Sequence, residues 1–346
     1  MVNAKISPEP DASAEILINS KGLEEFLNPI AKIIDRPAVD ATAQFDGQRI
    51  TQFTPAIDGQ RLDINKTTDE IASFLFDSQE NKEISISIKL PVIVTVAKVE
   101  DEKINSLGIK ELIGRGVSFF AGSITNRVFN IQLGSSRVNG IIIAPGETFS
   151  FNNTVGEVSG KTGYKQAYVI SSGRTVLDDG GGICQVSTTV FRAALNAGLQ
   201  IVSRTAHAYR VGYYEQQGFG PGLDATVFAP SVDFKFKNDT GNHILMQTVF
   251  NRTRSMLEVD IYGTRDGRSV EQGKPVILSR TPAPPEIRQD DSSLPRGTIK
   301  QVDFAAEGAD VYFKRKVYKS GVILHDDTFK SKFRPWQAIF LVGTGI

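Results

Sequence analysis

The chemistry available to this chain of 346 residues centres on a single cysteine, Cys184. The thiol follows three consecutive glycines and opens a helix, which the apolar spacing of the next residues predicts and which is expected to end at Gly198. Unpaired backbone N–H groups and the helix dipole favour negative charge in a first helical turn, so a thiol there has a lowered pKa. The pattern therefore predicts a nucleophilic thiolate.

His207 is the candidate partner of this thiolate, because a nucleophilic cysteine needs a group that accepts and returns its proton. It lies 23 positions further on (207 − 184), after the predicted helix and the apolar run LQIVS, so a returning strand would bring it beside Cys184. A third group usually orients the imidazole. Asp224, in GLDATV, is the first choice for that group, and Asp179 is the second.

The residues around this pair predict an oxyanion and substrate pocket. Glycines let the main chain approach a substrate closely and present N–H groups to an oxyanion. Arginines and tyrosines near His207 would suit a ligand that carries a carboxylate, although they could equally be ordinary solvated strand residues. The candidate oxyanion and substrate-binding residues are Gly181, Gly182, Gln185, Ser187, Arg204, Tyr209, Arg210 and Tyr213.

A structural interpretation of Cys184 stands beside the catalytic one. A lone cysteine usually packs as a small buried hydrophobic group, and three glycines can simply form a tight turn before a helix. His207 could likewise be a core histidine bonded to a backbone carbonyl group. A metal site built from Cys184, His207 and a carboxylate lacks any HxH, HExxH or CxxC spacing, so we expect no metal and no other cofactor.

The fold class predicted from the remaining patterns is α+β in three parts. A small α+β domain is expected over residues 1–112. A mostly-β central domain over 113–278 is expected to carry one main helix, which starts at the cysteine. Residues 279–346 are expected to form a linker and a β-rich tail.

Individual elements follow from local patterns. Apolar residues at helical spacing predict an amphipathic helix over residues 21–34, and alternating apolar residues predict a strand over 84–88. Pro, Asp and Ser enrichment over 281–297 predicts a linker or long exposed loop. Two strands joined at Ser320-Gly321 are expected in the tail.

Composition excludes several classes of protein. Lys+Arg and Asp+Glu both number 39, so the chain has no net charge and no bulk electrostatic attraction for nucleic acid. One cysteine excludes an intramolecular disulfide. No apolar run reaches the roughly 18 residues of a membrane span, and the polar N-terminus shows no signal peptide. We therefore expect a soluble chain, from which an anchoring segment could have been removed.

Six motifs that occur in a fixed order make the chain resemble the VanW family over about residues 118–250. They are PGETFSFNNTVG (145–156), GYKQAYVI (163–170), DDGGGICQVSTTVFRAALNAGL (178–199), RTAHAYRVGYY (204–214), GLDATV (222–227) and DFKFKNDT (233–240). The region over about 15–110 resembles the peptidoglycan-binding domain that often precedes VanW domains. The tail after Pro295 is similar to the G5-like β module often found behind them.

The resemblance implies a bacterial cell-envelope protein that faces outward and is usually tethered by an N-terminal membrane segment. We see no such segment in the sequence and interpret the chain as an ectodomain. The family takes its name from vancomycin-resistance gene clusters. Some VanW-domain proteins are similar in activity to L,D-transpeptidases, and on that analogy Cys184 is the nucleophile and His207 its base.

The combined expectation is acyl transfer on peptidoglycan stem peptides, through a thioester on Cys184 that an amine of a second stem resolves into a 3→3 cross-link. Two alternatives stay open. The first is a non-catalytic wall-binding or scaffolding protein in which Cys184 only packs. The second is a cysteine hydrolase in which water is the acceptor. The sequence predicts no oligomeric state.

Overall fold

The computed structural model describes residues 2–5, 15–18, 20–46, 50–54, 56–77, 87–97, 107–171 and 174–345. They group into two compact units. One is formed by Met1–Ala41 with Thr54–Ile104, and the other by Thr42–Phe53 with Asn105–Ile346. The domain boundaries predicted near residues 112 and 278 stay predictions. All the candidate catalytic residues belong to the second unit, which is therefore the unit that positions the chemistry.

The first unit contains two helices and several short strands. Helix α1 (Ser20–Ile34) confirms the amphipathic helix predicted over residues 21–34, and its buried face packs against Leu62. The other elements of this unit are β1 (Val2–Lys5), β2 (Glu15–Ile18), β5 (Gly59–Leu62), α2 (Ile64–Asp77) and β6 (Val92–Thr95).

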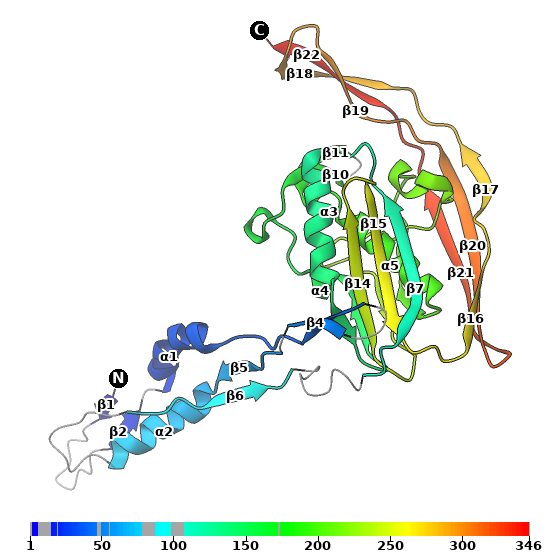
Figure 1. The fold of residues 1–346 in the computed structure, drawn as a ribbon. Coiled ribbons are helices and arrows are strands. Elements are labelled where there is room, and N and C mark those ends of the chain that lie inside the picture. Colours follow the sequence, from blue (N-terminus) through cyan, green and yellow to red (C-terminus); the bar gives the residue numbers. More distant parts are fainter. Residues whose placement is uncertain are drawn as a thin grey trace. The chain divides into compact units, whose positions relative to one another are not determined.

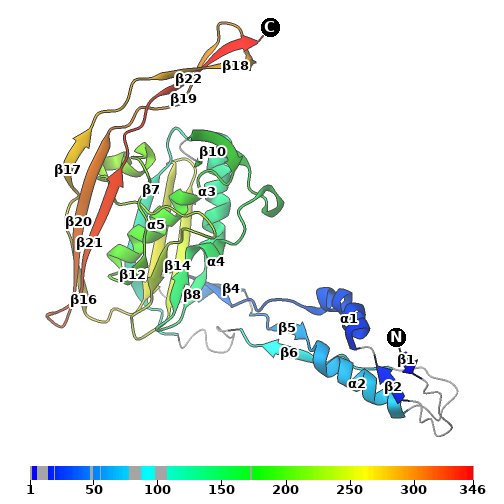
Figure 2. The same cartoon turned by 180° about the vertical axis from the view of Figure 1, so that it is seen from behind.

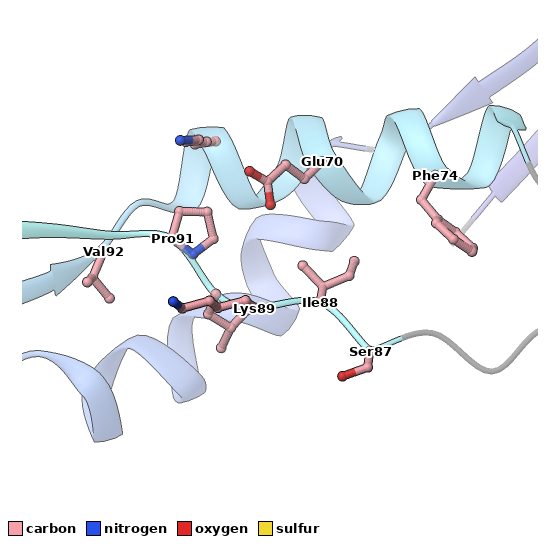
Figure 3. Close-up of a pocket in the computed structure, with 9 residues that line it drawn as sticks. Glu70, Phe74, Ser87, Ile88, Lys89, Pro91 and Val92 are labelled. Atoms are coloured by element: carbon pink, nitrogen blue, oxygen red, sulfur yellow. The ribbon is translucent and has the colours of Figure 1, made fainter.

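An open pocket of about 560 Å³ lies in the first unit, between helix α2 and the extended segment 87–92 (Figure 3). Glu70 and Phe74 of the helix line one side of it, as Figure 3 shows. Residues 84–86 of the strand predicted beside it lie outside the described residues. None of the candidate catalytic residues lines this pocket, so it is separate from the chemistry predicted for Cys184.

The second unit is organised around an antiparallel four-stranded sheet in the order β7-β15-β14-β8 (Figure 1). Helix α5 (Ile183–Asn196) packs on β7 and β15, and helix α3 (Thr125–Val138) packs on β14 and on α5. The strands of this sheet are β7 (Glu111–Phe119), β8 (Ile141–Ile143), β14 (Ile244–Asn251) and β15 (Met256–Gly263). The apolar face predicted for the helix after the cysteine is buried in this core, through Val186, Val190, Ala194 and Leu195.

Helix α3 is as long as α5, at 14 residues, whereas the sequence predicted one main helix in this region. Its buried face includes the polar residues Arg127, Asn130 and Ser135. Such a face lacks the apolar periodicity by which helices are recognised in a sequence. The α+β fold class itself is confirmed, since sheets and helices both contribute to the unit.

Two glycines of β7 let the backbone of α5 lie directly against the strand. A Cβ atom at Gly116 would lie 2.1 Å from the carbonyl oxygen of Thr189, and a Cβ atom at Gly114 would lie 2.5 Å from the amide nitrogen of Ala197. No real Cβ atom tolerates such distances, so only glycine allows this approach. The sheet thereby fixes the position of the helix that begins at the cysteine.

We expect Gly116→Ala to lower the free energy of unfolding by about 1–3 kcal/mol, because the added methyl group must push α5 away from the sheet. Urea unfolding of the purified protein measures the change. Gly241→Ala is the matched control, since a Cβ atom there meets nothing within 4 Å. Equal unfolding midpoints for the two variants would contradict the close contact between α5 and β7.

The remaining elements around the core are short. Strands β9, β12 and β13 form a three-stranded sheet in the order β12-β13-β9, β10 pairs with β11, and β3 pairs with β4. The hairpin β10–β11 leads directly into the glycine turn before α5. Their bounds are β3 (Thr42–Phe45), β4 (Ile50–Thr54), β9 (Thr148–Ser150), α4 (Phe151–Val155), η3 (Gly160–Thr162), β10 (Gln166–Ser171), β11 (Arg174–Asp179), β12 (Gln200–Ser203), η4 (Gly212–Gly218) and β13 (Lys235–Lys237).

The C-terminal strands form two further sheets, β16-β20-β17 with β21 paired to β20, and β18-β22-β19 (Figure 2). The predicted strand turn at Ser320-Gly321 is confirmed between β20 and β21. The predicted linker over 281–297 is wrong over most of its length, because β18 pairs in parallel with β22 through its backbone while its polar side chains stay largely exposed. The bounds are β16 (Arg268–Gln272), β17 (Val276–Thr281), β18 (Ile287–Pro295), β19 (Ile299–Asp303), β20 (Gly308–Lys319), β21 (Val322–Phe333) and β22 (Ile339–Gly345).

The β20–β21 hairpin is bound to the C-terminal end of α5 by a fully buried arginine, Arg315. Its guanidinium group pairs with Asp327 at 2.6 Å and donates hydrogen bonds to the carbonyl oxygens of Leu195 and Leu199. These carbonyls at the end of a helix carry partial negative charge, which a cation stabilises. The tail is therefore part of the packing around α5.

Candidate active site

Three side chains from separate parts of the sequence meet at the start of α5. The Nδ1 atom of His207 lies 2.6 Å from Oδ2 of Asp224, which also accepts the backbone N–H of His207 at 2.9 Å. The imidazole also interacts with the thiol of Cys184, and each group shifts the pKa of the other. Asp179, the second choice from the sequence, instead accepts the N–H of Gly160 at 2.6 Å.

Short extended segments position His207 and Asp224 beside the helix. Thr205 and Thr226 pair in an antiparallel bridge, which sets the two segments side by side. The Ser187 hydroxyl donates a hydrogen bond to the carbonyl oxygen of Ala225 at 2.6 Å and so ties the second segment to α5. The side chain of Ser187 therefore has a positioning role in place of the predicted substrate contact.

The carboxylate of Asp224 is buried and held by a second cation. The Arg204 guanidinium donates to the Asp224 backbone carbonyl at 2.7 Å and lies 3.3 Å from its Oδ1 atom, and both side chains are 4% exposed. A buried carboxylate needs such partners, because removal from water otherwise favours its protonated form. Asp224 can therefore remain charged behind the imidazole.

The thiol of Cys184 is half-buried and lies at the end of the glycine turn. Its Sγ atom is 3.5 Å from the carbonyl oxygen of Val227 and 3.6 Å from the Thr226 hydroxyl. The preceding Gly182 has a φ of 114°, and a Cβ atom there would lie 3.0 Å from the carbonyl oxygen of Arg127. Glycine is thus required at Gly182 to bring the chain into the helix at this angle.

The ionisation of the three groups is coupled. Burial opposes ionisation of Cys184, but the hydrogen bond and charge of His207, with the polar groups of Val227 and Thr226, lower the pKa of the thiol. Burial would also lower the pKa of His207, but Asp224 and Cys184 raise it to about 9. The pKa of Asp224 falls to about 2, because His207 and Arg204 outweigh the effect of burial. At neutral pH the geometry therefore favours a thiolate–imidazolium pair.

We expect the His207→Asn variant to react with iodoacetamide at pH 7 at least about tenfold more slowly than wild type. Burial then acts on Cys184 without the opposing imidazole, so the pKa of the thiol rises. The measurement is the alkylation rate as a function of pH. Wild type should hold a plateau well below the ordinary thiol pKa of 9.0. Superimposable profiles for the two proteins would exclude the ion pair.

The raised pKa of His207 makes the stability of the fold decrease as the pH rises. The folded pKa of His207, about 9, exceeds its ordinary value of 6.5, so its contribution is complete below about pH 6.5 and is lost as the pH rises through about 9. The melting temperature of wild type should therefore fall by more between pH 6.5 and 9 than that of the His207→Asn variant. Parallel losses in the two proteins would contradict the raised pKa.

The two arginines predicted to hold a carboxylate, Arg204 and Arg210, each have a protein partner for the guanidinium group. Arg204 holds Asp224, and Arg210 pairs with Glu215 at 2.6 Å. The Gln185 side chain is likewise held within the protein. It is fully buried, accepts a hydrogen bond from Arg127 at 2.8 Å and donates to groups of β7.

Tyr213 and Gly181, both predicted to bind substrate, contact residues of α3. Tyr213 stacks its ring over the guanidinium of Arg127, 4.0 Å from the ring centre. Gly181 is buried, and its carbonyl oxygen accepts a hydrogen bond from Asn130 of α3 at 3.1 Å. Tyr213 and Gly181 therefore help to hold the turn that carries Cys184.

Tyr209, also predicted to bind substrate, has a hydroxyl group without a hydrogen-bond partner among the described residues. The hydroxyl is buried, and the ring stacks on Trp336 of the C-terminal tail at 4.6 Å. Burial, with the charges of Asp303 and Cys184, raises the pKa of Tyr209, so the hydroxyl keeps its proton. It is therefore a hydrogen-bond donor within electrostatic range of the thiol.

Sequence reasoning missed the contributions of α3 and η4. Arg127 and Asn130 of α3 bond to the residues around the glycine turn, and Tyr214 of η4 packs its ring 4.8 Å from that of His207. A polar residue in a helix is ordinarily taken as solvent-exposed, so no local signal marks Arg127 or Asn130. Tyr214 stood in the tyrosine-rich run after His207 and could have been included.

Within the described residues, no group of three His, Cys, Asp or Glu side chains is arranged to hold a metal ion. The polar groups at Cys184 are instead a thiol, an imidazole and a buried carboxylate. This set suits covalent acyl transfer, in which the thiolate attacks a carbonyl carbon and the imidazolium protonates the leaving group.

Two family models match the chain. The model described as "VanW like protein" matches residues 126–262, which include Cys184, His207 and Asp224. The model described as "Putative peptidoglycan binding domain" matches residues 2–83, in the part of the chain before the sheet of the second unit.

The chain is also similar to two curated bacterial proteins. It is 30% identical over 231 residues to the Uncharacterized protein YoaR of Bacillus subtilis (strain 168), a match that covers 67% of this chain and 71% of that protein. It is 36% identical over 115 residues to the Vancomycin B-type resistance protein VanW of Enterococcus faecalis (strain ATCC 700802 / V583). The second match covers 33% of this chain and 42% of the E. faecalis protein.

Among solved structures, two G5 domains align with part of the chain. The IgA1 protease G5 domain has a TM-score of 0.15 and 16% identity, and the match covers 24% of this chain and all (100%) of that one. The HP0197-G5 structure has a TM-score of 0.12 and 18% identity, with 22% and 97% of the two chains covered.

Proposed function

Since the chain belongs to the VanW family, we propose that it is a cell-wall acyltransferase that joins two peptidoglycan stem peptides through a thioester on Cys184. The family relation and the peptidoglycan-binding match associate the chain with the cell wall. The observation that carries the catalytic proposal is the cluster of Cys184, His207 and Asp224 at the start of α5, in which Asp224 is hydrogen-bonded to His207 and His207 interacts with the thiol.

In the first step the thiolate of Cys184 attacks the carbonyl carbon of the third stem residue. The imidazolium of His207 gives its proton to the nitrogen of the terminal D-Ala, the C–N bond breaks, and D-Ala leaves as a free amine. The donor stem is then held as a thioester. Asp224 keeps the imidazole in the orientation in which its free nitrogen faces the sulfur.

In the second step the side-chain amine of another stem attacks the thioester. His207, now neutral, accepts a proton from that amine, the C–S bond breaks, and the thiolate–imidazolium pair is restored with a new amide bond between the stems. No net oxidation or hydrolysis occurs. Splitting one amide exchange into two covalent steps lowers each barrier.

The oxyanion that forms on the carbonyl oxygen in both steps needs hydrogen-bond donors. The backbone N–H groups of Ile183 and Gln185 already donate to carbonyl oxygens of the turn, so we assign the amides of Gly182 and Cys184 to the oxyanion. The unpartnered hydroxyl of Tyr209 is the side-chain donor that we add to them. Loss of one such donor typically slows a reaction about 100- to 1000-fold.

The first unit would supply affinity for the polymer and so raise the local concentration of stem peptides at the second. This assignment implies that the chain acts on the outer side of the cytoplasmic membrane, in the cell envelope. In the described part of the chain no helix has both the length and the apolar character that crossing a membrane requires.

The test of the proposed function is incubation of the full chain with purified disaccharide tetrapeptide, followed by mass spectrometry of the products. Acyl transfer predicts a dimer that lacks one D-Ala, together with free D-Ala. Tripeptide monomers without dimers would instead identify a hydrolase that uses the same residues. Binding to peptidoglycan without any product would support a scaffolding protein and contradict the acyltransferase.

A further inference from the structure

Arg127 of α3 is a buried cation without a carboxylate partner in the part of the chain that the structure describes. Its side chain donates hydrogen bonds to the Ser123 hydroxyl at 2.7 Å and to the amide oxygen of Gln185 at 2.8 Å, and Tyr213 covers its face. Only 8% of the residue is exposed. Burial of a full positive charge among neutral groups is costly, so its retention calls for an anion.

The guanidinium lies next to the nucleophile. Gln185, to which it is bonded, directly follows Cys184, and a Cβ atom at Gly182 would lie 3.1 Å from the Cγ atom of Arg127. The ionisable groups that interact with Arg127 are Tyr214, Tyr213 and Cys184. Of these, Cys184 has a lowered pKa, and His207 already balances the charge of its thiolate.

The other buried arginines of the second unit have a negative group to face. Arg204 pairs with Asp224, Arg315 pairs with Asp327, and Arg192 interacts with Asp224 while it donates to three backbone carbonyls. Near the thiol, Arg127, Arg204 and His207 together carry more positive charge than Asp224 and the thiolate balance. The site therefore holds an excess of positive charge.

We propose that Arg127 is a specificity-determining residue, whose unpaired charge makes Cys184 select substrates that carry a negative charge beside the bond to be broken. A peptide that ends in a free carboxylate one residue after the attacked carbonyl has this chemistry. The identification of that peptide as a stem donor rests on the proposed function. The selection of anionic reagents by the thiolate does not depend on the proposed function.

The neighbours of Arg127 do not themselves require a charge. The Ser123 hydroxyl and the Gln185 amide oxygen would accept hydrogen bonds from a neutral donor equally well. A charge within the protein also acts over several ångströms with less screening than in water, so direct contact with the ligand is not needed for the effect. Arg127 can act through its charge or through its hydrogen bonds. Variants that keep only one of these features separate the two effects.

The test compares the alkylation rates of Cys184 by iodoacetate, which is negatively charged, and by iodoacetamide, which is neutral. Both reagents consume the same thiolate, so their rate ratio reports the local electric field and not the pKa of the thiol. In wild type the ratio should exceed that of free cysteine. We expect Arg127→Gln to lower the ratio about fivefold or more and Arg127→Lys to keep it within about twofold of wild type.

Ser123→Ala is the matched control, because it removes a hydrogen bond of Arg127 and leaves the charge in place. Its ratio should equal that of wild type. An Arg127→Gln ratio equal to wild type in a folded variant would overturn the proposal. If that variant does not fold, the wild-type ratio decides: a value no higher than that of free cysteine also overturns it.

A second measurement connects the inference to the reaction. Wild type should use a disaccharide tetrapeptide with a free terminal carboxylate in preference to its terminal carboxamide, and Arg127→Gln should lose that preference. If dimers never form but the alkylation ratio behaves as expected, the proposed function fails and the role of Arg127 stands. If dimers form at equal rates from both donors, the proposed function stands and the role of Arg127 in substrate selection fails.

Discussion

Cys184→Ala is expected to reduce dimer formation from disaccharide tetrapeptide by at least about a thousandfold. The hydroxyl and amide groups around the thiol can still bind the donor, but no atom remains to form the thioester. The half-buried side chain loses only its sulfur, so the fold and the binding of peptidoglycan should persist. Product analysis by mass spectrometry, with a peptidoglycan pull-down on the same sample, measures both quantities.

Cys184→Ser is the companion variant, since it keeps the shape of the side chain and replaces a thiol by a hydroxyl of much higher pKa. The dimer-forming rate of this serine variant should fall nearly as far as that of Cys184→Ala. The raised pKa of His207 keeps its imidazole protonated at neutral pH, so the imidazole cannot accept the proton of a hydroxyl. Undiminished dimer formation by either variant would eliminate Cys184 as the nucleophile.

Asp224→Asn is expected to lower the rate of acyl transfer by about 10³- to 10⁴-fold, as the same change does in a serine protease triad. Three effects act in one direction. The pKa of His207 falls from about 9, because burial then acts without the carboxylate. The thiol loses its charged partner, and the imidazole is no longer held in the required tautomer. Arg204 also loses its counter-charge, so the free energy of unfolding should fall by about 3–5 kcal/mol.

Asp179→Asn is the matched control for this experiment. Asp179 bonds to Gly160 and has no contact with His207, so neither the transfer rate nor the histidine pKa should change. The chain has three histidines, so NMR titration of the ring signals can follow His207 directly. A His207 pKa that stays near 9 in Asp224→Asn would show that the carboxylate does not orient the imidazole.

That Cys184, His207 and Asp224 lie together could be predicted because the sequence leaves few choices. It offers one cysteine and three histidines, and the glycine run marks the place where a helix begins. The sequence alone cannot place Asp224 or Asp179 within hydrogen-bond distance of His207. The backbone bridge between Thr205 and Thr226 explains why Asp224 lies there, since it aligns the segments that carry His207 and Asp224.

The environment of these residues could not be predicted in the same way. Whether Arg204 and Arg210 face a ligand or the protein depends on carboxylates and carbonyls that only the tertiary structure brings near them. The sequence did not predict helix α3, because its buried face is partly polar. It did not predict β18, because exposed polar residues can form a strand when their backbone pairs with another strand. Local patterns report periodicity and turn chemistry, and they are silent about such pairing.

The contacts between the candidate site and the C-terminal tail could not be predicted from the sequence either. The backbone N–H of Arg334 donates to the carbonyl oxygen of Ala208, Trp336 stacks on Tyr209, and Ser331 bonds to Arg204. These contacts surround the segment that carries His207. The sequence predicts a linker and a β-rich tail over residues 279–346, and it gives no sign that the tail supports the segment around His207.

The central claim is that Cys184 carries the donor stem as a thioester, and intact-protein mass spectrometry tests it most directly. Wild type mixed with disaccharide tetrapeptide and quenched in acid should gain the mass of the donor less one D-Ala, and hydroxylamine should remove the adduct. The label should map to the peptide that contains Cys184. A chain that forms dimers without this adduct, or carries the adduct on another residue, would contradict the account.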